Sequence, residues 1–253
     1  MQRELVVDRR FRGPPDSGNG GYVAGLVGRE LGATAEVTLR APPPLARPMT
    51  LAGDDRKLRL LDGDLVVAEG EALDDLDVAV PAPVAYDAAV DAARSSYVLV
   101  HPEHHPFPGC FVCGFERDGD DGLRIFVGPV AGRPVAAAGW VPHPSLADTD
   151  GIVCPEFVWA ALDCSGGIGS IYVDGEAQED LPTYVLGRLA ARLVAPVHAG
   201  TECVVTGWRR RADGRKLDAG SAVHDADGTL LAYARATWIA LRPEPALGHE
   251  TRS

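Results

Sequence analysis

The sequence predicts an α+β fold in which two antiparallel sheets are each wrapped around a central helix. The main observation is an internal repeat, because each half of the 253-residue chain runs as a strand, a helix, a proline-interrupted strand and a hairpin. Short segments recur in the same order: Val37-Thr38-Leu39-Arg40 resembles Ala191-Arg192-Leu193-Val194, and Arg56-Lys57-Leu58 resembles Arg215-Lys216-Leu217. One helix covered by antiparallel strands is a two-layer arrangement, and two copies predict a pseudo-symmetric pair.

The first half is organised around a predicted helix. Apolar residues recur between positions 22 and 31 at three- and four-residue spacing, so they share one helical face. Asn19 is a favourable N-cap, and Gly20 and Gly21 then carry first-turn N–H groups that can hold an oxyanion or a phosphate. Gly25 and Gly28 each cost about 1 kcal/mol relative to alanine, which indicates that a backbone or a ligand comes close there.

Strand and turn patterns divide the rest of the chain. They predict strands at residues 4–11, 35–40, 58–61, 65–72, 135–140, 183–194, 202–210, 217–225 and 230–241. A second helix is predicted from Pro155 to about Cys164, with proline at its first position. We therefore expect an N-terminal domain over 1–80, a proline-rich linker over 81–107 with a short helix at 86–95, a C-terminal domain over 108–241 and a disordered tail over 242–253.

Composition and charge exclude several functional classes. The chain is 46% hydrophobic and 24% charged, which is typical of a soluble globular protein. A net charge of −12 argues against nucleic acid and anionic membranes as partners. No apolar stretch approaches the roughly 20 residues of a membrane helix, and no signal sequence is recognisable. Five cysteines, an odd number, favour a reducing compartment, so we expect a cytoplasmic protein.

Motifs in both halves resemble those of hotdog-fold thioesterases. Cys110-Phe111-Val112-Cys113-Gly114, with Gly122-Leu123 downstream, is similar to the opening of the phenylacetate-pathway type. Those enzymes continue with His-Gly-Gly at a helix start and an aspartate nine residues after that His. Here Cys154-Pro155-Glu156 stands at the helix start and Asp163 at the aspartate position. The first half is similar to the N-terminal half of double-hotdog acyl-CoA thioesterases, with Asn19-Gly20-Gly21 at the same helix start.

The resemblance implies a tandem (double) hotdog with one active site shared between its halves. In hotdog dimers the oxyanion-binding amides of one subunit face the acid of the other, so Asn19-Gly20-Gly21 would face Asp163. The mirror-image site would be inactive, because Gly28 stands where its acid would be and Cys154-Pro155-Glu156 lacks the glycines. The implied activity is hydrolysis of an acyl-CoA or acyl-carrier thioester by a homo-oligomer, a homodimer of the doubled unit, without a cofactor or a metal.

The residue types fit that chemistry. Gly20 and Gly21 are candidate oxyanion donors, and Asn19 would fix the turn that presents them. Asp163 would activate water or attack the carbonyl, and the apolar run 157–162 before it predicts a raised pKa. The candidate residues for a substrate tunnel between the two helices are Tyr22, Leu26, Phe157 and Trp159. The candidate basic pair for the phosphates of coenzyme A is Arg209 and Arg210.

Other interpretations of these residues stay open. Asp163 can also be a buried acid satisfied by a backbone amide, which would leave a non-catalytic protein that binds acyl-CoA or another apolar ligand. Hydratase chemistry on the same fold usually pairs an acid with a histidine, and neither predicted helix start carries one. Arg209 and Arg210 also fit a solvated hairpin tip.

The cysteines allow two interpretations as well. Cys110 and Cys113, with His104 and His105 nearby, have zinc-like spacing. A Cys-x-x-Cys motif supplies only two of the four ligands that a structural zinc site needs, and the same stretch fits a tight structural turn. The sequence therefore predicts no metal, and Cys164 is expected to be a packed thiol.

Overall fold

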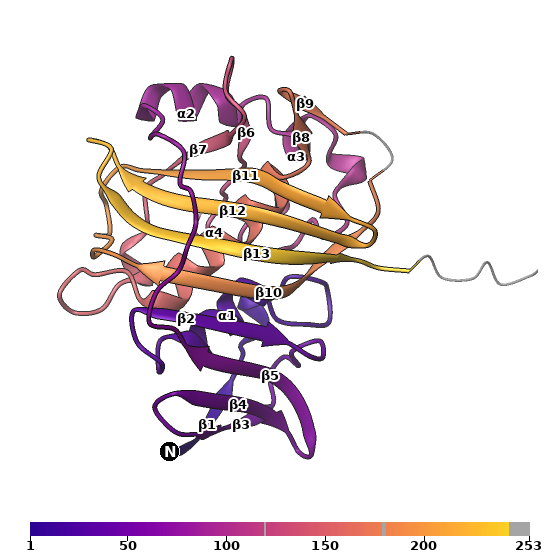
Figure 1. Ribbon diagram of the computed structural model, residues 1–253, viewed down its shortest axis with the longest axis vertical. Coiled ribbons are helices and arrows are strands. Elements are labelled where there is room, and N and C mark those ends of the chain that lie inside the picture. The colour runs from indigo at the N-terminus through magenta and orange to yellow at the C-terminus, as the bar shows by residue number, and fades with distance from the viewer. Residues whose placement is uncertain (119, 179–180, 243–253) are drawn as a thin grey trace, which may run out of the picture.

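The computed structural model describes residues 1–118, 120–178 and 181–242 (Figure 1). Eleven strands form one antiparallel sheet: β1 (Gln2–Val6), β2 (Thr34–Leu39), β3 (Pro48–Gly53), β4 (Lys57–Asp62), β5 (Leu65–Ala72), β6 (Gly128–Pro129), β7 (Ala136–Trp140), β10 (Tyr184–Leu193), β11 (Cys203–Asp213), β12 (Lys216–Asp225) and β13 (Leu230–Ala240). A short hairpin, β8 (Tyr172–Val173) with β9 (Glu176–Ala177), stands apart from it. The helices are α1 (Gly20–Gly28), α2 (Tyr86–Ala93), α3 (Tyr97–Val100) and α4 (Pro155–Gly169).

The predicted repeat is present in the order of the strands. The first half of the sheet runs β1-β3-β4-β5-β2, and the second runs β7-β11-β12-β13-β10, so equivalent strands follow one another in the same way. The two expected sheets are, however, one continuous sheet. β2 pairs antiparallel with β10, with Val37 opposite Leu189, because each half would otherwise leave the backbone groups of this strand unpaired at an open edge.

The two longer helices, α1 and α4, pack against each other on one face of the sheet. Their contact passes through glycines of α1: a Cβ on Gly25 would lie 2.5 Å from the Cα of Glu156, and one on Gly28 would lie 2.6 Å from the Trp159 ring. The prediction that a backbone or a ligand comes close is confirmed at Gly25, where the backbone of Glu156 approaches, whereas Gly28 makes room for the Trp159 side chain. At the start of α1 the predicted N-cap is also confirmed, because the Asn19 Oδ1 accepts a hydrogen bond from the Tyr22 N–H at 2.9 Å.

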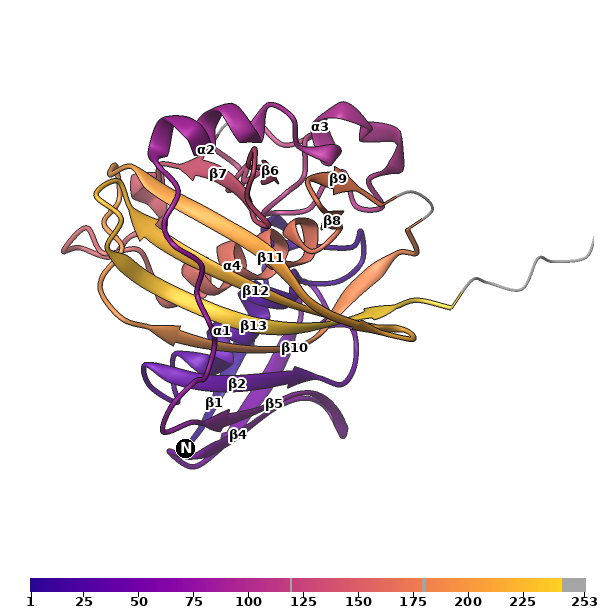
Figure 2. The ribbon, with the colours of Figure 1, turned by 45° about the horizontal axis from the view of Figure 1, so that its top comes forward.

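The segment between the halves covers the other face of the sheet. It crosses the strands of the second half before it enters α2 (Figure 2), and the Tyr233 hydroxyl donates to the Leu76 carbonyl oxygen at 3.0 Å along the way. Ala89 and Ala92 of α2 pack with Val204 and Trp208 of β11 in a second, smaller core. The short helix predicted at 86–95 is therefore present, and it shields the outer face of this half from water.

Other boundaries differ from the sequence-based expectation. The strand expected over 4–11 ends at Val6, because the Asp8 side chain accepts from the Arg10 N–H at 2.8 Å and stabilises a 3-10 turn. β3 was not predicted, since Pro48 opens it. α4 continues past Cys164 to Gly169. The expected disordered tail lies, beyond Arg242, outside the described residues.

Candidate functional site

The N-terminus of α1 meets the middle of α4 at Asp163. This side chain is 1% exposed, and its Oδ2 accepts a hydrogen bond from the Gly21 N–H at 2.8 Å. A Cβ on Gly21 would lie 2.3 Å from the Asp163 Cβ, so only glycine allows the helices to approach this closely. The two parts of the site that the sequence placed in different halves are therefore in direct contact.

Burial makes the carboxyl group of Asp163 a much weaker acid than an exposed one. Desolvation raises the pKa of its carboxyl group to about 8, although hydrogen bonds from the Gly21 N–H and the Asn19 side chain lower it. Within the described part of the chain, the Asp163 Oδ1 is buried and has no hydrogen-bond partner. One oxygen is thus held in place by α1, and the other is available to accept a proton.

The amides at the start of α1 have different environments. The Gly21 N–H is occupied by Asp163, whereas the Gly20 N–H has no acceptor among the described residues. Gly20 lines a cavity together with Leu186, whose Cβ would lie 2.9 Å from a Cβ on Gly20. Of the two predicted oxyanion donors, Gly20 has the free amide.

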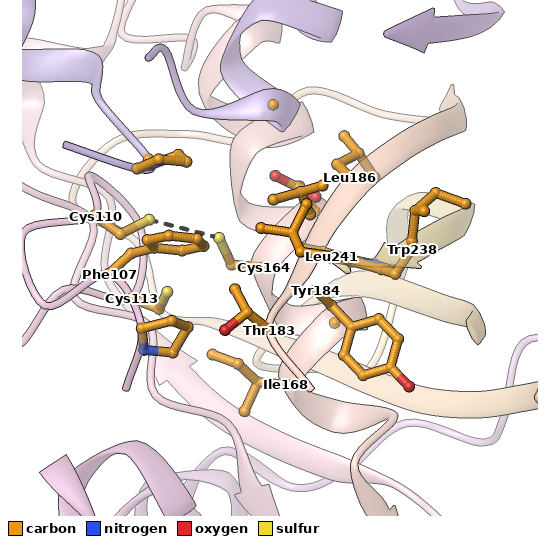
Figure 3. Close-up of a pocket in the computed structure, with 18 of the residues that line it drawn as sticks. Phe107, Cys110, Cys113, Cys164, Ile168, Thr183, Tyr184, Leu186, Trp238 and Leu241 are labelled. Atoms are coloured by element: carbon orange, nitrogen blue, oxygen red, sulfur yellow. Dashed lines mark hydrogen bonds between the residues drawn. The ribbon is translucent and has the colours of Figure 1, made fainter. Parts of the chain in front are cut away.

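A cavity of about 1320 Å³ opens beside these groups. Asn19, Gly20 and Asp163 are part of its wall. Other parts of the wall come from α3, α4, β9, β10, β13 and the loops around residues 40 and 107, some of which are drawn in Figure 3. The larger apolar side chains of the wall include Leu39, Phe107, Ile168, Leu186, Trp238 and Leu241. The volume exceeds the roughly 300–1,000 Å³ of most small-molecule sites, and its lining favours a large apolar group.

The predicted tunnel residues lie elsewhere. Tyr22 stacks on Phe11 with ring centroids 4.2 Å apart, and Phe157 lies 5.7 Å from Tyr22 in the same aromatic cluster. Trp159 fills the contact between the helices, and Leu26 is 5% exposed in the core. None of the four is among the described residues of the cavity wall. The physical reason is that the glycines of α1 let the helices touch, which leaves no tunnel between them.

The basic pair is also distant from the cavity wall. Arg209 and Arg210 lie on β11 and line a separate hollow of about 310 Å³ beside the β8–β9 hairpin. The Arg209 guanidinium donates to the Gln178 side chain at 2.5 Å. The structure therefore does not bring these arginines to Asp163.

The mirror-image position holds an ion pair. Glu156 at the start of α4 is 6% exposed, and its Oε1 lies 2.6 Å from the Arg29 Nη1. Trp159 packs against Gly28, where the second acid would stand. Among the described residues at this position, no carboxyl group accepts a hydrogen bond from a glycine N–H, in contrast to Asp163 and Gly21.

Three cysteines also line the cavity beside Asp163. The sulfur atoms of Cys110, Cys113 and Cys164 all lie within 4.8 Å of one another, and all three side chains are buried. A second group with metal-ligand atoms, His101, Glu103 and His104, is exposed. The sequence singled out Cys110 and Cys113, and the structure adds Cys164 from α4.

Comparisons with known proteins concern the fold. Neither protein-family models nor curated protein sequences give a match to this chain. Among solved structures, a hotdog-fold protein of unknown function from Alicyclobacillus acidocaldarius is 14% identical, with a TM-score of 0.60 over 96% of this chain and 94% of that one. A tesB protein of Mycobacterium avium subspecies paratuberculosis is 10% identical, with a TM-score of 0.57 over 95% and 93%.

A third full-length neighbour comes from Thermobifida fusca and is described as a candidate thioesterase II. It is 15% identical, with a TM-score of 0.55 over 95% of this chain and 92% of that one. These likenesses show that the chain has the hotdog fold. None of the helices in the described ranges combines the length and apolarity that a membrane crossing requires.

Proposed function

We propose that this chain is a tandem hotdog protein that hydrolyses an acyl thioester at a single site shared between its halves. The observation that carries the proposal is the hydrogen bond from the Gly21 N–H to the buried Asp163, beside a large apolar cavity. The repeated strand order supports the tandem arrangement. The names of the tesB and thioesterase II neighbours support the class of reaction.

The proposed mechanism follows from the two oxygens of Asp163. The Gly21 N–H holds Oδ2, so Oδ1 takes a proton from a water molecule while the water oxygen bonds to the thioester carbonyl carbon. The negative charge that develops on the carbonyl oxygen is stabilised by the Gly20 N–H and by the positive end of α1. The carbon–sulfur bond then breaks, and the proton held by Asp163 passes to the leaving thiolate.

The cavity sets the expected substrate. Its apolar wall, with Ile168, Leu186 and Trp238, would bind the acyl group and exclude water from it. The carrier of the acyl group is coenzyme A or an acyl carrier protein, and we infer a cytoplasmic homo-oligomer, a homodimer of the doubled unit. β1 and β6 are the outer strands of the sheet and are the candidate edges for such an assembly.

A second function has its own support. Because the pKa of Asp163 is raised to about 8, most of the carboxyl groups are protonated at pH 7, and a protonated acid cannot accept a proton from water. A non-catalytic protein that binds acyl-CoA in the same cavity would use Asp163 as a hydrogen-bonding group only.

Hydrolysis of a panel of acyl-CoA thioesters by the wild type and by Asp163→Asn separates the two functions. We expect a fall of about 10²- to 10⁴-fold in kcat/KM, typical of a lost general base, with unchanged acyl-CoA binding by calorimetry. Asp150→Asn, at an exposed position, is the matched control. Binding without hydrolysis in the wild type, or equal hydrolysis by Asp163→Asn, would reject the catalytic role.

A further inference from the structure

Three thiols from two distant parts of the chain converge at the cavity. Cys110 and Cys113 lie on one tight turn, closed by the Gly114 N–H, which donates to the Cys110 carbonyl oxygen at 2.9 Å. Cys164 projects from α4. The Cys110 and Cys164 sulfur atoms are 3.8 Å apart, and Cys113 points toward the same point (Figure 3). All three are free thiols.

The spacing of the sulfur atoms matches a metal–thiolate site. A zinc–sulfur distance of about 2.3 Å in a tetrahedron places neighbouring sulfurs about 3.8 Å apart. The Cys110–Cys164 distance has this value, and the limit of 4.8 Å for all three pairs requires a shift of about 1 Å at most.

Hydrogen-bond donors surround these sulfurs. The Asn19 Nδ2 lies 3.5 Å from the Cys164 sulfur and 3.7 Å from that of Cys110. Hydrogen-bond donors of this kind stabilise thiolates and are typical of the shell around metal-bound cysteines. The Asn19 side chain is therefore placed to act as such a donor to two of the three sulfurs.

The nearby histidine does not complete the ligand set. The His105 Nε2 lies 3.1 Å from the Cys113 carbonyl oxygen, and its Nδ1 accepts from the Phe107 N–H at 3.0 Å. Both ring nitrogens are therefore used within the turn. The carboxylate of Asp163 is outside the group of mutually close ligand atoms. The fourth ligand must come from the cavity, which all three cysteines line.

We propose that Cys110, Cys113 and Cys164 bind Zn²⁺ as a three-thiolate site whose fourth position opens into the cavity. A small ligand, water or a thiolate brought by a bound molecule, would occupy that position. Asn19 would hold two of the thiolates, as well as capping α1. The site neither requires nor implies catalysis by Asp163, so metal binding can be tested independently of thioester hydrolysis.

Cobalt titration of the full chain tests the site. The reduced protein, stripped with EDTA, is titrated with Co²⁺, and the thiolate-to-cobalt charge-transfer band and the tetrahedral ligand-field bands are recorded. We expect one equivalent of Co²⁺ per chain and its displacement by Zn²⁺. Loss of an outer-shell partner usually costs 10–100-fold in affinity, so Cys164→Ser, Cys113→Ser and Cys110→Ser should each weaken binding by more than about 100-fold.

The chain supplies its own controls. Cys154→Ser and Cys203→Ser change cysteines outside the cluster and should leave the bands intact. Because serine at a buried position can prevent folding, alkylation of the unaltered protein is a second measurement. Zn²⁺ should protect three cysteines, identified by mass spectrometry. Absence of the charge-transfer band in the wild type, its persistence in Cys164→Ser, or protection of other cysteines would overturn the proposal.

Discussion

Replacing Asp163 by asparagine should stabilise the fold while it removes the proposed hydrolysis. Asparagine has the same shape, and its side-chain oxygen can accept the hydrogen bond that the Gly21 N–H now donates to Oδ2. Its NH2 group would stand where the Oδ1 is buried with no partner in the described part of the molecule. The substitution therefore preserves packing and removes only the titratable group.

The size of the expected gain in stability follows from the raised pKa of Asp163. Burial moves the pKa of Asp163 from 3.8 to about 8, so between these two values the unfolded chain has released a proton that the fold retains. This group's contribution to stability is fully present below pH 3.8 and is lost as the pH rises to about 8, at about 1.4 kcal/mol per pH unit. Relative to pH values below 3.8, the buried carboxyl group therefore lowers the free energy of unfolding by about 4 kcal/mol at pH 7 and about 2 kcal/mol at pH 5.

Denaturant unfolding at pH 5, 7 and 8 measures the effect. EDTA and a reductant keep the three thiols free of metal, since a bound cation would favour the ionised carboxylate. The stability gain of Asp163→Asn over the wild type should grow with pH, to about 4 kcal/mol at pH 7, whereas Asp150→Asn should show no such trend. A variant no more stable than the wild type at pH 7, or a gain independent of pH, would refute the assignment of a buried, proton-retaining carboxyl group.

Three further substitutions test the helix contact, the mirror-image position and the cavity. Gly21→Ala places a Cβ 2.3 Å from that of Asp163 and should lower the stability measured by thermal unfolding by more than about 2 kcal/mol. The control Gly166→Ala, in α4, has no neighbour closer than 3.6 Å and should be neutral or stabilise the protein by about 1 kcal/mol. Equal effects would contradict the close contact. Glu156→Gln should lower stability by about 1–3 kcal/mol through its lost ion pair and leave hydrolysis unchanged; a loss as large as that of Asp163→Asn would mean that this side is active. Ile168→Trp should fill the cavity and raise KM for long-chain more than for acetyl thioesters, and an unchanged chain-length profile would count against the cavity as the acyl site.

Much of the fold follows from local sequence patterns. The alternating strands, the helix start at Asn19 and the repeat of both halves depend on residues close in sequence, and the sequence predicts them. The joining of the halves into one sheet does not, because the pairing of Val37 with Leu189 depends on which strand edges meet in space. The alternation within a strand carries no information about its distant partner.

The site divides in the same way. The order and spacing of motifs placed Asp163 opposite Gly21, and the contact is present. The predicted tunnel residues lie outside the cavity wall. Tyr22 and Trp159 have the apolar spacing of any packed helix, and that spacing does not distinguish a core from a cavity. Leu186 and Trp238 face each other on β10 and β13, so the actual wall depends on a strand pairing. The third thiol likewise reaches Cys110 only through the fold.

The pairing of β2 with β10 also shapes how the chain is made. Thr38 and its partner Arg188 are 150 residues apart, so during synthesis the N-terminal half emerges long before β10 exists. Its own hairpins can form, but the edge of β2 and the glycine face of α1 stay uncovered until α4 and β10 follow. Such a nascent chain carries an open strand edge of the kind that chaperones shield. A fragment of residues 1–80 expressed alone would keep that edge permanently, and aggregation is its expected fate.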